Sequence, residues 1–133
     1  MRDRVLQTWR YLATSAADAR HAERTAEILR ALGADEELVL AGLLHDRGKP
    51  DHVPVVQRIA GVLLERFAPR ALPRLRRGEG TFARYLDHAR RGAELARRAG
   101  ASERVVRLIA RHHERPLSED ERLLARADRE ALP

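Results

Sequence analysis

The sequence predicts an all-helical protein, and three observations support this fold class. Ala and Leu, which are strong helix formers, dominate the apolar residues, whereas aromatic residues make up only 4% of the chain. Apolar residues recur at helical spacing, and no useful length of chain alternates with the period of two that a strand needs. The 133 residues are enough to bury a core. We therefore expect one domain over residues 1–133, a bundle of about six or seven helices with its core in residues 15–129 and an N-terminal helix in residues 1–14.

The first half of the chain is expected to form four helices, over residues 3–13, 16–32, 36–46 and 55–67. The first has apolar residues at helical spacing, namely Val5, Leu6, Trp9 and Leu12. Gly33 can end the second helix in a left-handed conformation, and Asp35 can cap the third. Gly48 and Pro50 then stop the third helix. The fourth is unusually apolar, which predicts that it crosses the core.

The second half begins with the least regular stretch, residues 69–80, where two Pro and two Gly leave room for a short helix only. Three longer helices are expected after it, over residues 81–99, 102–113 and 118–128. Gly100 ends the first of these, and Ser102 begins the next. Ser118 and Glu121 form a capping box for the last helix.

The composition excludes several classes of protein. The chain has no Cys, which excludes disulfides, thiolate metal sites and a cysteine nucleophile. No apolar run approaches the roughly 18 residues of a membrane span, and residues 1–12 lack the apolar stretch of a signal peptide. We therefore expect a cytoplasmic protein without a membrane partner.

The net charge of +6 could indicate binding to nucleic acid, but the pattern of charges argues against it. The 26 basic residues are interleaved with 20 acidic residues rather than gathered in one block. Stacking aromatics are also scarce, so nucleic acid is an unexpected partner. All the basic residues except one are Arg, which makes the single lysine, Lys49, a candidate for a specific role.

Histidines and aspartates are distributed in a way that favours a metal site. The six histidines are His21, His45, His52, His88, His112 and His113. Asp46 directly follows His45 at the end of a predicted helix, and Asp128 lies in the last one. Neutral imidazole and carboxylate are ligands that Fe, Mn, Zn, Ni and Co can share. Four helices can therefore direct such side chains to one point, and a fifth can add Asp128.

Each of these residues also has an ordinary interpretation when it is taken alone. A single His on a helix is more often a surface or core residue than a ligand. The pair His112 and His113 could cap a helix C-terminus, and Asp128 could be a solvated acid. The order and setting of the whole set favour the metal site.

The segment Leu43-Leu44-His45-Asp46-Arg47-Gly48-Lys49 resembles the signature of the HD-domain superfamily, in the subset that reads His-Asp-hydrophobic-Gly-Lys. The family has an upstream His, which His21 matches, and a later His, which His88 matches. A His-His pair and a final Asp follow, and they are matched by Arg111-His112-His113-Glu114 and Ala127-Asp128. The resemblance covers about residues 15–129.

The resemblance implies a helical bundle that holds divalent or iron ions. By position, the first ion would be bound by His21, His45, Asp46 and Asp128. Asp46 would bridge to a second ion, which His88 and His112 would complete. We therefore expect two divalent transition-metal ions, drawn from Fe, Mn, Zn, Ni and Co.

The same resemblance implies hydrolysis of phosphate esters, mostly of nucleotides. Two ions roughly 3.5–4 Å apart would generate a hydroxide and bind the phosphate oxygens, so no Ser or Cys nucleophile is needed. Asp46 and Lys49 would be the catalytic residues, with Lys49 also binding substrate. Arg24, one turn from His21, and His113 are further candidates for binding substrate; Arg111 and Arg115 are weaker ones.

The sequence also departs from the family pattern. Arg47 stands where the subset has an aliphatic residue, so its side chain must leave the core. Arg115-Pro116 replaces the Tyr-Pro motif that marks the cyclic-di-GMP phosphodiesterase branch, which argues against that substrate. His52 matches nothing in the pattern and is interpreted as a loop residue.

The leading hypothesis is a metal-dependent phosphomonoesterase or phosphodiesterase that acts on a nucleotide or another small phosphorylated molecule. Two alternatives remain open at this stage. One is a di-iron oxygenase of the same superfamily, and the other is a non-catalytic nucleotide-sensing or interaction module. A homodimer is also possible, with Trp9, Tyr11 and Leu12 as candidates for its interface.

Overall fold

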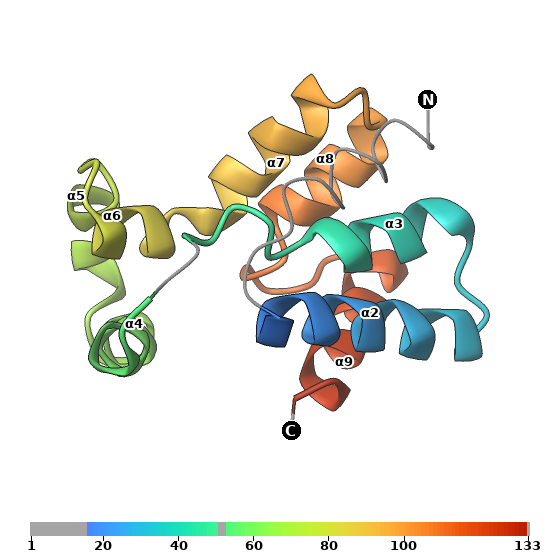
Figure 1. The fold of residues 1–133 in the computed structure, drawn as a ribbon, viewed down its shortest axis with the longest axis horizontal. Helices are drawn as coiled ribbons and strands as arrows, with labels where there is room; N and C mark the ends of the chain where they lie inside the picture. The colour runs from blue at the N-terminus through green and yellow to red at the C-terminus, as the bar shows by residue number, and fades with distance from the viewer. Residues whose placement is uncertain (1–15, 51–52, 133) are drawn as a thin grey trace.

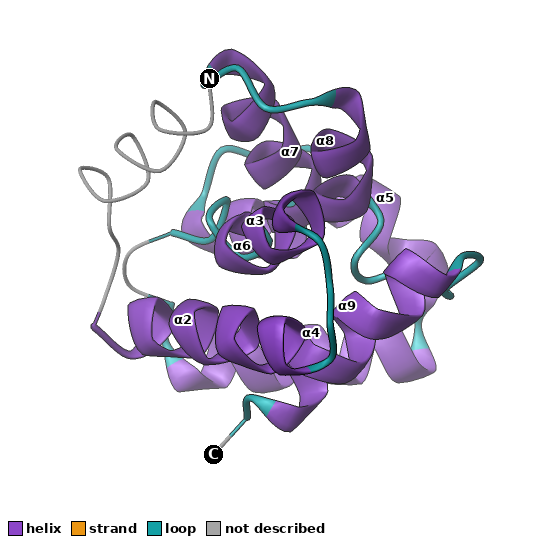
Figure 2. Ribbon diagram, turned by 90° about the vertical axis from the view of Figure 1, so that its right-hand side faces the viewer, coloured by secondary structure: helices purple, strands orange, loops and turns teal. Residues whose placement is uncertain are grey.

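The computed structural model describes residues 16–50 and 53–132, and this part of the chain is helical with no strand (Figures 1 and 2). Its helices are α2 (Ala16–Ala31), α3 (Glu36–Leu44), α4 (Val55–Phe67), the 3₁₀ helix η1 (Pro69–Ala71), α5 (Leu72–Leu75), α6 (Thr81–Leu86), α7 (His88–Arg98), α8 (Glu103–Ala110) and α9 (Glu119–Glu130). The predicted all-helical class is therefore confirmed. The helix predicted over residues 3–13, with Trp9, Tyr11 and Leu12, lies outside the described residues. None of the described helices is long and apolar enough to cross a membrane.

Five helices form the main bundle, which contains the hydrophobic core. Helix α2 packs on α3 and α9, α3 packs on α8 and α9, and α7 packs on α8 (Figure 1). Leu29, Leu38, Ile109 and Leu124 are the largest aliphatic side chains that are almost completely buried between these helices. Burial of each such side chain contributes about 1.5–3 kcal/mol to the stability of the fold. The bundle therefore provides a rigid support for residues at the inner ends of its helices.

The helix ends follow the predicted capping chemistry. Gly33 has φ of 80°, the left-handed conformation expected after α2. The Asp35 side chain accepts a hydrogen bond from the Leu38 amide, and the Ser118 hydroxyl accepts one from the Glu121 amide. These side chains satisfy amides that the first turn of each helix leaves unpaired.

Two predicted helices end or break earlier than the periodicity indicates. The helix predicted over residues 81–99 is divided at Asp87, where φ is −99° and ψ is 13°. His88 is consequently the first residue of α7 instead of an interior residue. The helix predicted over residues 102–113 ends at Ala110, so His112 and His113 lie in the turn that follows. Both changes bring histidines to helix ends, where the backbone can direct them inward.

Helix α4 does not cross the core, so that prediction is wrong. Together with η1, α5 and α6 it forms a separate unit, residues 53–86, which we call the α4 lobe (Figure 1). Large apolar side chains of α4 are exposed: Val56 by 77%, Ile59 by 56%, Val62 by 61%, Leu63 by 51% and Phe67 by 74%. Gly61 lies on the opposite side of the helix, against Tyr85 and Leu86. Apolar periodicity identified the helix correctly, but it did not reveal what the apolar face contacts.

Candidate metal centre

The candidate metal centre is built around the C-terminal end of α3. His45 is completely buried, and its Nδ1–H donates a hydrogen bond of 2.7 Å to the carbonyl oxygen of Gly42. A carbonyl oxygen can only accept, so Nδ1 carries the hydrogen and Nε2 of the neutral ring keeps a lone pair. Asp46 follows in the turn after the helix, and its Oδ2 lies 3.3 Å from His45 Nε2. The turn thus brings two neighbouring residues to the same side of the chain.

Two other imidazoles are fixed in the same way. Nδ1 of His88 donates to the Tyr85 carbonyl oxygen at 2.7 Å, and Nδ1 of His112 donates to the Ile109 carbonyl oxygen at 2.6 Å. In each case, as in His45, the acceptor lies three residues earlier in the chain. Metal-binding histidines typically donate their second ring nitrogen to a carbonyl or carboxylate, which fixes the tautomer and the orientation of the ring. All three Nε2 atoms are therefore directed to the same region, and in the neutral rings their lone pairs are available to a metal ion.

Asp46 lies between two sets of histidines and directs one carboxylate oxygen to each. Its Oδ2 is 3.3 Å from Nε2 of His45 and 3.7 Å from Nε2 of His21. Its Oδ1 is 3.3 Å from Nε2 of His88 and 3.5 Å from Nε2 of His112. A carboxylate in this position can bind two cations at once, one through each oxygen.

Asp128 and His21 close the side of the centre that faces α2 and α9. Asp128 Oδ1 is 2.7 Å from His21 Nε2 and 3.0 Å from His45 Nε2. Helix α9 supplies Asp128 and α2 supplies His21, and these two helices pack directly on each other. Residues more than 100 positions apart in the sequence therefore meet at one point.

Among the described residues, two groups of potential ligands result, and Asp46 belongs to both. The first group is His21, His45, Asp46 and Asp128, and the second is Asp46, His88, His112 and His113. Within each group the ligand atoms lie within 4.8 Å of one another. Transition metals bind imidazole nitrogen and carboxylate oxygen at about 2.0–2.2 Å, so each group has room for one ion with small side-chain movements. The donor set fits the ions that the sequence predicted.

His113, predicted from the sequence to bind substrate, lies among the potential ligands of the second group. Its Nε2 lies 2.8 Å from Nε2 of His88, and the two rings are perpendicular with centroids 4.7 Å apart. The geometry therefore makes His113 a candidate ligand of the second group. The sequence did not indicate this second role, because a helix continued through residue 113 would separate the imidazoles of His112 and His113 by about 100°. The turn after Ala110 removes that separation.

Two glycines allow α7 to approach the end of α3. A Cβ atom on Gly48 would lie 2.1 Å from the His88 carbonyl oxygen and 2.4 Å from the Gly92 nitrogen. Gly48 has no positive φ, so the requirement here is for space and not for an unusual backbone conformation. The contact of these two backbones holds the half of the site on α7 against the half on α3.

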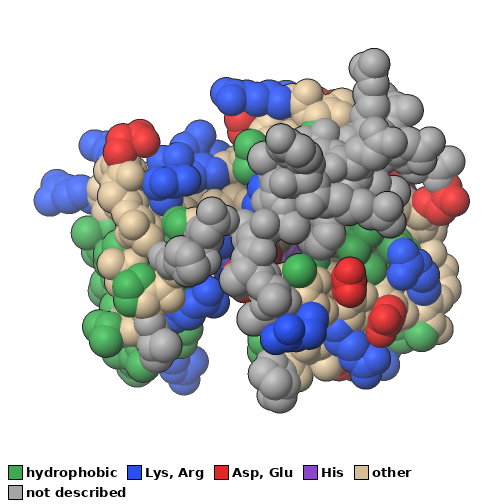
Figure 3. Space-filling view, viewed as in Figure 1, with side chains coloured by type: hydrophobic (Ala, Val, Ile, Leu, Met, Phe, Trp, Pro, Cys, Tyr) green, Lys and Arg blue, Asp and Glu red, His purple; other side chains and the backbone are tan. Residues whose placement is uncertain are grey.

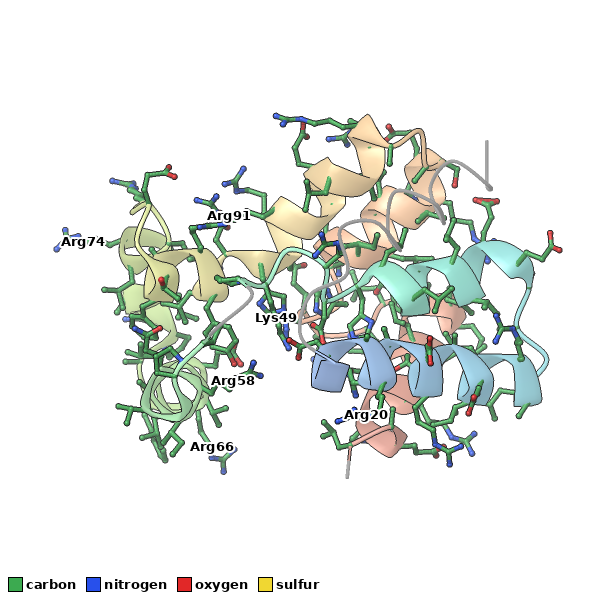
Figure 4. The ribbon with its side chains drawn as sticks, in the orientation of Figure 1. Arg20, Lys49, Arg58, Arg66, Arg74 and Arg91 are labelled. Atoms are coloured by element: carbon green, nitrogen blue, oxygen red, sulfur yellow. The ribbon has the colours of Figure 1, made fainter. Side chains whose placement is uncertain are left out.

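Lys49 lies beside the shared carboxylate. Its Nζ is 3.0 Å from Asp46 Oδ2 and 6.0 Å from the centre of the Tyr85 ring, and its side chain is 15% exposed. Figure 4 shows Lys49 pointing toward the region between α2 and the α4 lobe. A cation in this position can contact both the metal centre and a bound anion.

Electrostatics favour positive charge at His45, whereas burial lowers the pKa values of His112 and His113 in the second group. Burial alone would lower the pKa of His45, but the charge of the adjacent Asp46 outweighs burial and raises the pKa to about 10. Burial would raise the pKa of Asp46, but the His45 ring outweighs it and holds that pKa well below its usual value. In the metal-free protein, His45 therefore carries a proton, and the neighbouring carboxylates stabilise its positive charge.

The raised pKa gives a direct prediction for the metal-free protein. Because the pKa rises from 6.5 to about 10, the His45 ring should still be protonated at about pH 8, and its contribution to stability should be lost as the pH rises through 10. Imidazole ¹⁵N chemical shifts in the presence of a chelator would measure this protonation. Addition of Zn²⁺ should abolish the imidazolium signal because the metal and the proton compete for Nε2. A neutral His45 at that pH without metal would contradict the prediction.

The arginines suggested by the sequence bind partners outside the two ligand groups. Arg24 has a 61% exposed side chain whose Nη1 is 3.4 Å from Glu27 Oε2. Arg111 forms ion pairs with Glu114 and Glu121. Arg115 is exposed and accepts a hydrogen bond from Arg111 through its carbonyl oxygen. His52 lies outside the described residues.

A hollow of about 310 Å³ lies between α5 and α7, apart from the metal ligands. Its lining residues are Pro73, Arg76, Arg77, Glu79, Asp87, Arg90 and Arg91. Asp87 directly precedes His88, but its carboxylate accepts two hydrogen bonds from Arg90, of 2.6 and 2.8 Å. This buried acid is therefore paired with arginine and belongs to neither ligand group.

Comparison with known proteins agrees with this geometry. The HD domain family matches residues 18–132, which include every residue of both ligand groups. Neither the curated proteins nor the solved structures gave a match. The match covers most of the sequence, and the chain belongs to the HD-domain superfamily of metal-dependent phosphohydrolases.

Proposed function

We propose that this protein is a two-metal phosphohydrolase that cleaves a phosphate ester of a nucleotide or a similar small molecule. The observation that carries the proposal is the set of three imidazoles whose Nδ1 atoms donate to backbone carbonyls while their Nε2 atoms surround Asp46. A surface cluster of His and Asp residues would not need three identical backbone anchors. Membership in the HD-domain superfamily supports the same class of reaction.

The side chains have separate tasks in the proposed reaction. His21, His45 and Asp128 would hold one ion, His88, His112 and His113 the other, and Asp46 both. When bound, the two ions would activate water and withdraw charge from the phosphate oxygens. Lys49 is close enough to the shared carboxylate to orient the phosphate group or to stabilise the charge of the leaving group. The fixed tautomers of the imidazoles would keep the ligand geometry constant while the substrate reacts.

The proposal can be tested with purified metal-free protein loaded with Mn²⁺. Elemental analysis should give about two ions per chain, and the loaded protein should hydrolyse an aryl phosphate and at least one nucleotide. Metal-replete protein that is inactive on a broad panel of phosphate esters would contradict the proposal. With Fe²⁺ loaded in place of Mn²⁺, oxygen consumption without phosphate release would favour the di-iron oxygenase alternative. Nucleotide binding without turnover would favour the sensor.

A substitution at Lys49 separates substrate contact from metal binding. Lys49→Gln should lower kcat/KM by about 100-fold, because removal of one charged group from a phosphate site has an effect of this size. The metal content should stay near two, because Lys49 belongs to neither ligand group. Steady-state kinetics with elemental analysis measures both quantities.

Arg24→Gln is the matched control for Lys49→Gln. Its guanidinium is exposed and pairs with Glu27, so kcat/KM should change by less than about twofold. Equal losses in the two variants would show that the effect of Lys49 is a general effect of positive charge.

A further inference from the structure

We propose that the α4 lobe is a docking face for an anionic phospholipid surface. This face is separate from the metal centre, and the inference goes beyond the proposed hydrolysis. It rests on two independent features of the described residues 53–86, namely an exposed apolar stripe and a concentration of positive charge. The expectation of no membrane partner came from the absence of a long apolar run, which a helix lying on a membrane does not need.

The apolar stripe runs along the outer side of α4. Val56, Ile59, Val62, Leu63 and Phe67 are each more than half exposed, and Leu75 of α5 is 39% exposed. Their spacing places them on one broad face of the helix, opposite buried Gly61. Figure 3 shows apolar side chains on the outer surface of this lobe. Contiguous patches of this kind on soluble proteins mark sites of interaction.

The positive charge of the chain is concentrated in the same lobe. Residues 53–86 contain seven arginines and two glutamates, a net charge of +5, while the whole chain has +6. The arginines are Arg58, Arg66, Arg70, Arg74, Arg76, Arg77 and Arg84. Arg66 lies over the Phe67 ring at 5.9 Å, and Figure 4 shows Arg66 and Arg74 extending from the lobe on different sides. Arg66 thus borders the apolar stripe at Phe67.

The positive charge of the lobe distinguishes among the partners that could cover the apolar stripe. A second copy would bring another lobe of charge +5 against the first, which is repulsive. A nucleic acid would satisfy the arginines but would leave the aliphatic side chains without an apolar partner, and single-strand binding uses stacking aromatics instead. An anionic bilayer satisfies both features, because acyl chains accept the apolar face while the arginines reach the headgroups.

The length and flanks of the helix suit binding parallel to the membrane. Thirteen residues make a helix of about 20 Å, which is too short to span a bilayer but long enough to lie along its surface. The flanking helices η1, α5 and α6 carry three of the arginines, Arg70, Arg74 and Arg84, and all three are exposed. The docked lobe would therefore insert its apolar side chains to headgroup depth while the main bundle stays in water.

Vesicle binding tests the proposal with the whole chain. The protein should sediment with vesicles of phosphatidylcholine and phosphatidylglycerol in equal parts, and at least tenfold more weakly with phosphatidylcholine alone. The apolar variant Ile59→Gln/Phe67→Gln and the charge variant Arg70→Gln/Arg74→Gln should each weaken binding by at least tenfold. The control for the apolar variant is Leu117→Gln, since Leu117 is 71% exposed and lies outside the lobe. The control for the charge variant is Arg97→Gln/Arg98→Gln on α7. Neither control should change the binding to vesicles.

A fluorescent probe shows whether the stripe enters the bilayer. The chain has a single Trp, so Phe67→Trp in a Trp9→Phe background reports on one position. Its emission should shift to shorter wavelength on anionic vesicles, whereas Leu117→Trp in the same background should not shift. Helical circular dichroism checks that each variant is folded.

Three outcomes would overturn the proposal. The first is no binding to anionic vesicles, or binding that the apolar variant does not weaken, because charge alone would then explain it. The second is a parent protein that forms a stable dimer and an apolar variant that is monomeric. The third is tighter binding to nucleic acid than to vesicles.

Discussion

Asp46→Asn is expected to abolish the two-metal site and to lower phosphate ester hydrolysis by at least about 1,000-fold, or about 4 kcal/mol in activation free energy. The reason is that, within residues 16–50 and 53–132, Asp46 is the one residue common to both ligand groups, with Oδ2 facing His45 and Oδ1 facing His88. An amide offers one oxygen and one NH₂ group, which cannot bind a metal, so Asn cannot bridge two ions. Elemental analysis should show at most one ion per chain, and kinetics with an aryl phosphate measures the loss of activity.

Asp87→Asn is a suitable control, because Asp87 is also a buried carboxylate and directly precedes the potential ligand His88. The Asp87 carboxylate pairs with Arg90 and belongs to neither ligand group, so two ions should still bind and most activity should remain. If Asp46→Asn kept two ions and activity within tenfold of the parent, Asp46 would not be the bridging residue and the proposed mechanism would be wrong.

Gly48→Ala is expected to destabilise the fold by about 3 kcal/mol or more, and to impair metal binding as well. A Cβ atom at this position would overlap the His88 carbonyl oxygen at 2.1 Å and the Gly92 nitrogen at 2.4 Å. These are backbone atoms, so no side-chain rotation can relieve the overlap. The end of α7 must move, and His88 moves with it. Thermal and urea unfolding measure the stability, and elemental analysis measures the metal content.

Gly80→Ala provides the comparison for Gly48→Ala. Nothing lies within 4 Å of a Cβ atom at Gly80, and its φ of −69° suits any residue. Its unfolding free energy should therefore stay within about 1 kcal/mol of the parent. Similar unfolding free energies for the two variants would show that the backbones at Gly48 and Gly92 can separate without loss of the fold.

The sequence predicted helix positions better than it predicted what the helices contact. Caps such as Asp35 and Ser118 are local, because the side chain bonds to an amide within the same first turn. The break at Asp87 has no Gly or Pro signal, so helical periodicity alone continues through it. The exposed face of α4 could not be foreseen either, because an apolar helical face has the same pattern whether it meets a core or another surface.

The candidate site could be predicted in outline because its residue types are rare and their order matches a known family. The fold brings His21, His45, His88, His112 and Asp128 close to Asp46, in agreement with the order of the family motif. The position of His113 beside His88 could not be predicted, because it depends on the turn after Ala110, and tertiary packing determines that turn. Arg24 was suggested by its distance along a helix from His21, but that distance did not determine which way its side chain turns.

The carbonyl anchors of His45, His88 and His112 have a consequence for how the protein acquires its ions. Each ring is tied to the backbone three residues earlier, so its orientation is set by the local chain fold and not by a bound ion. Little conformational entropy then remains to be lost when an ion arrives. Chelation should leave a folded apoprotein that reloads rapidly, unlike small zinc domains that unfold without metal. In a cell, the ions it carries would therefore reflect which metals are available at the time, and not which one was present during folding.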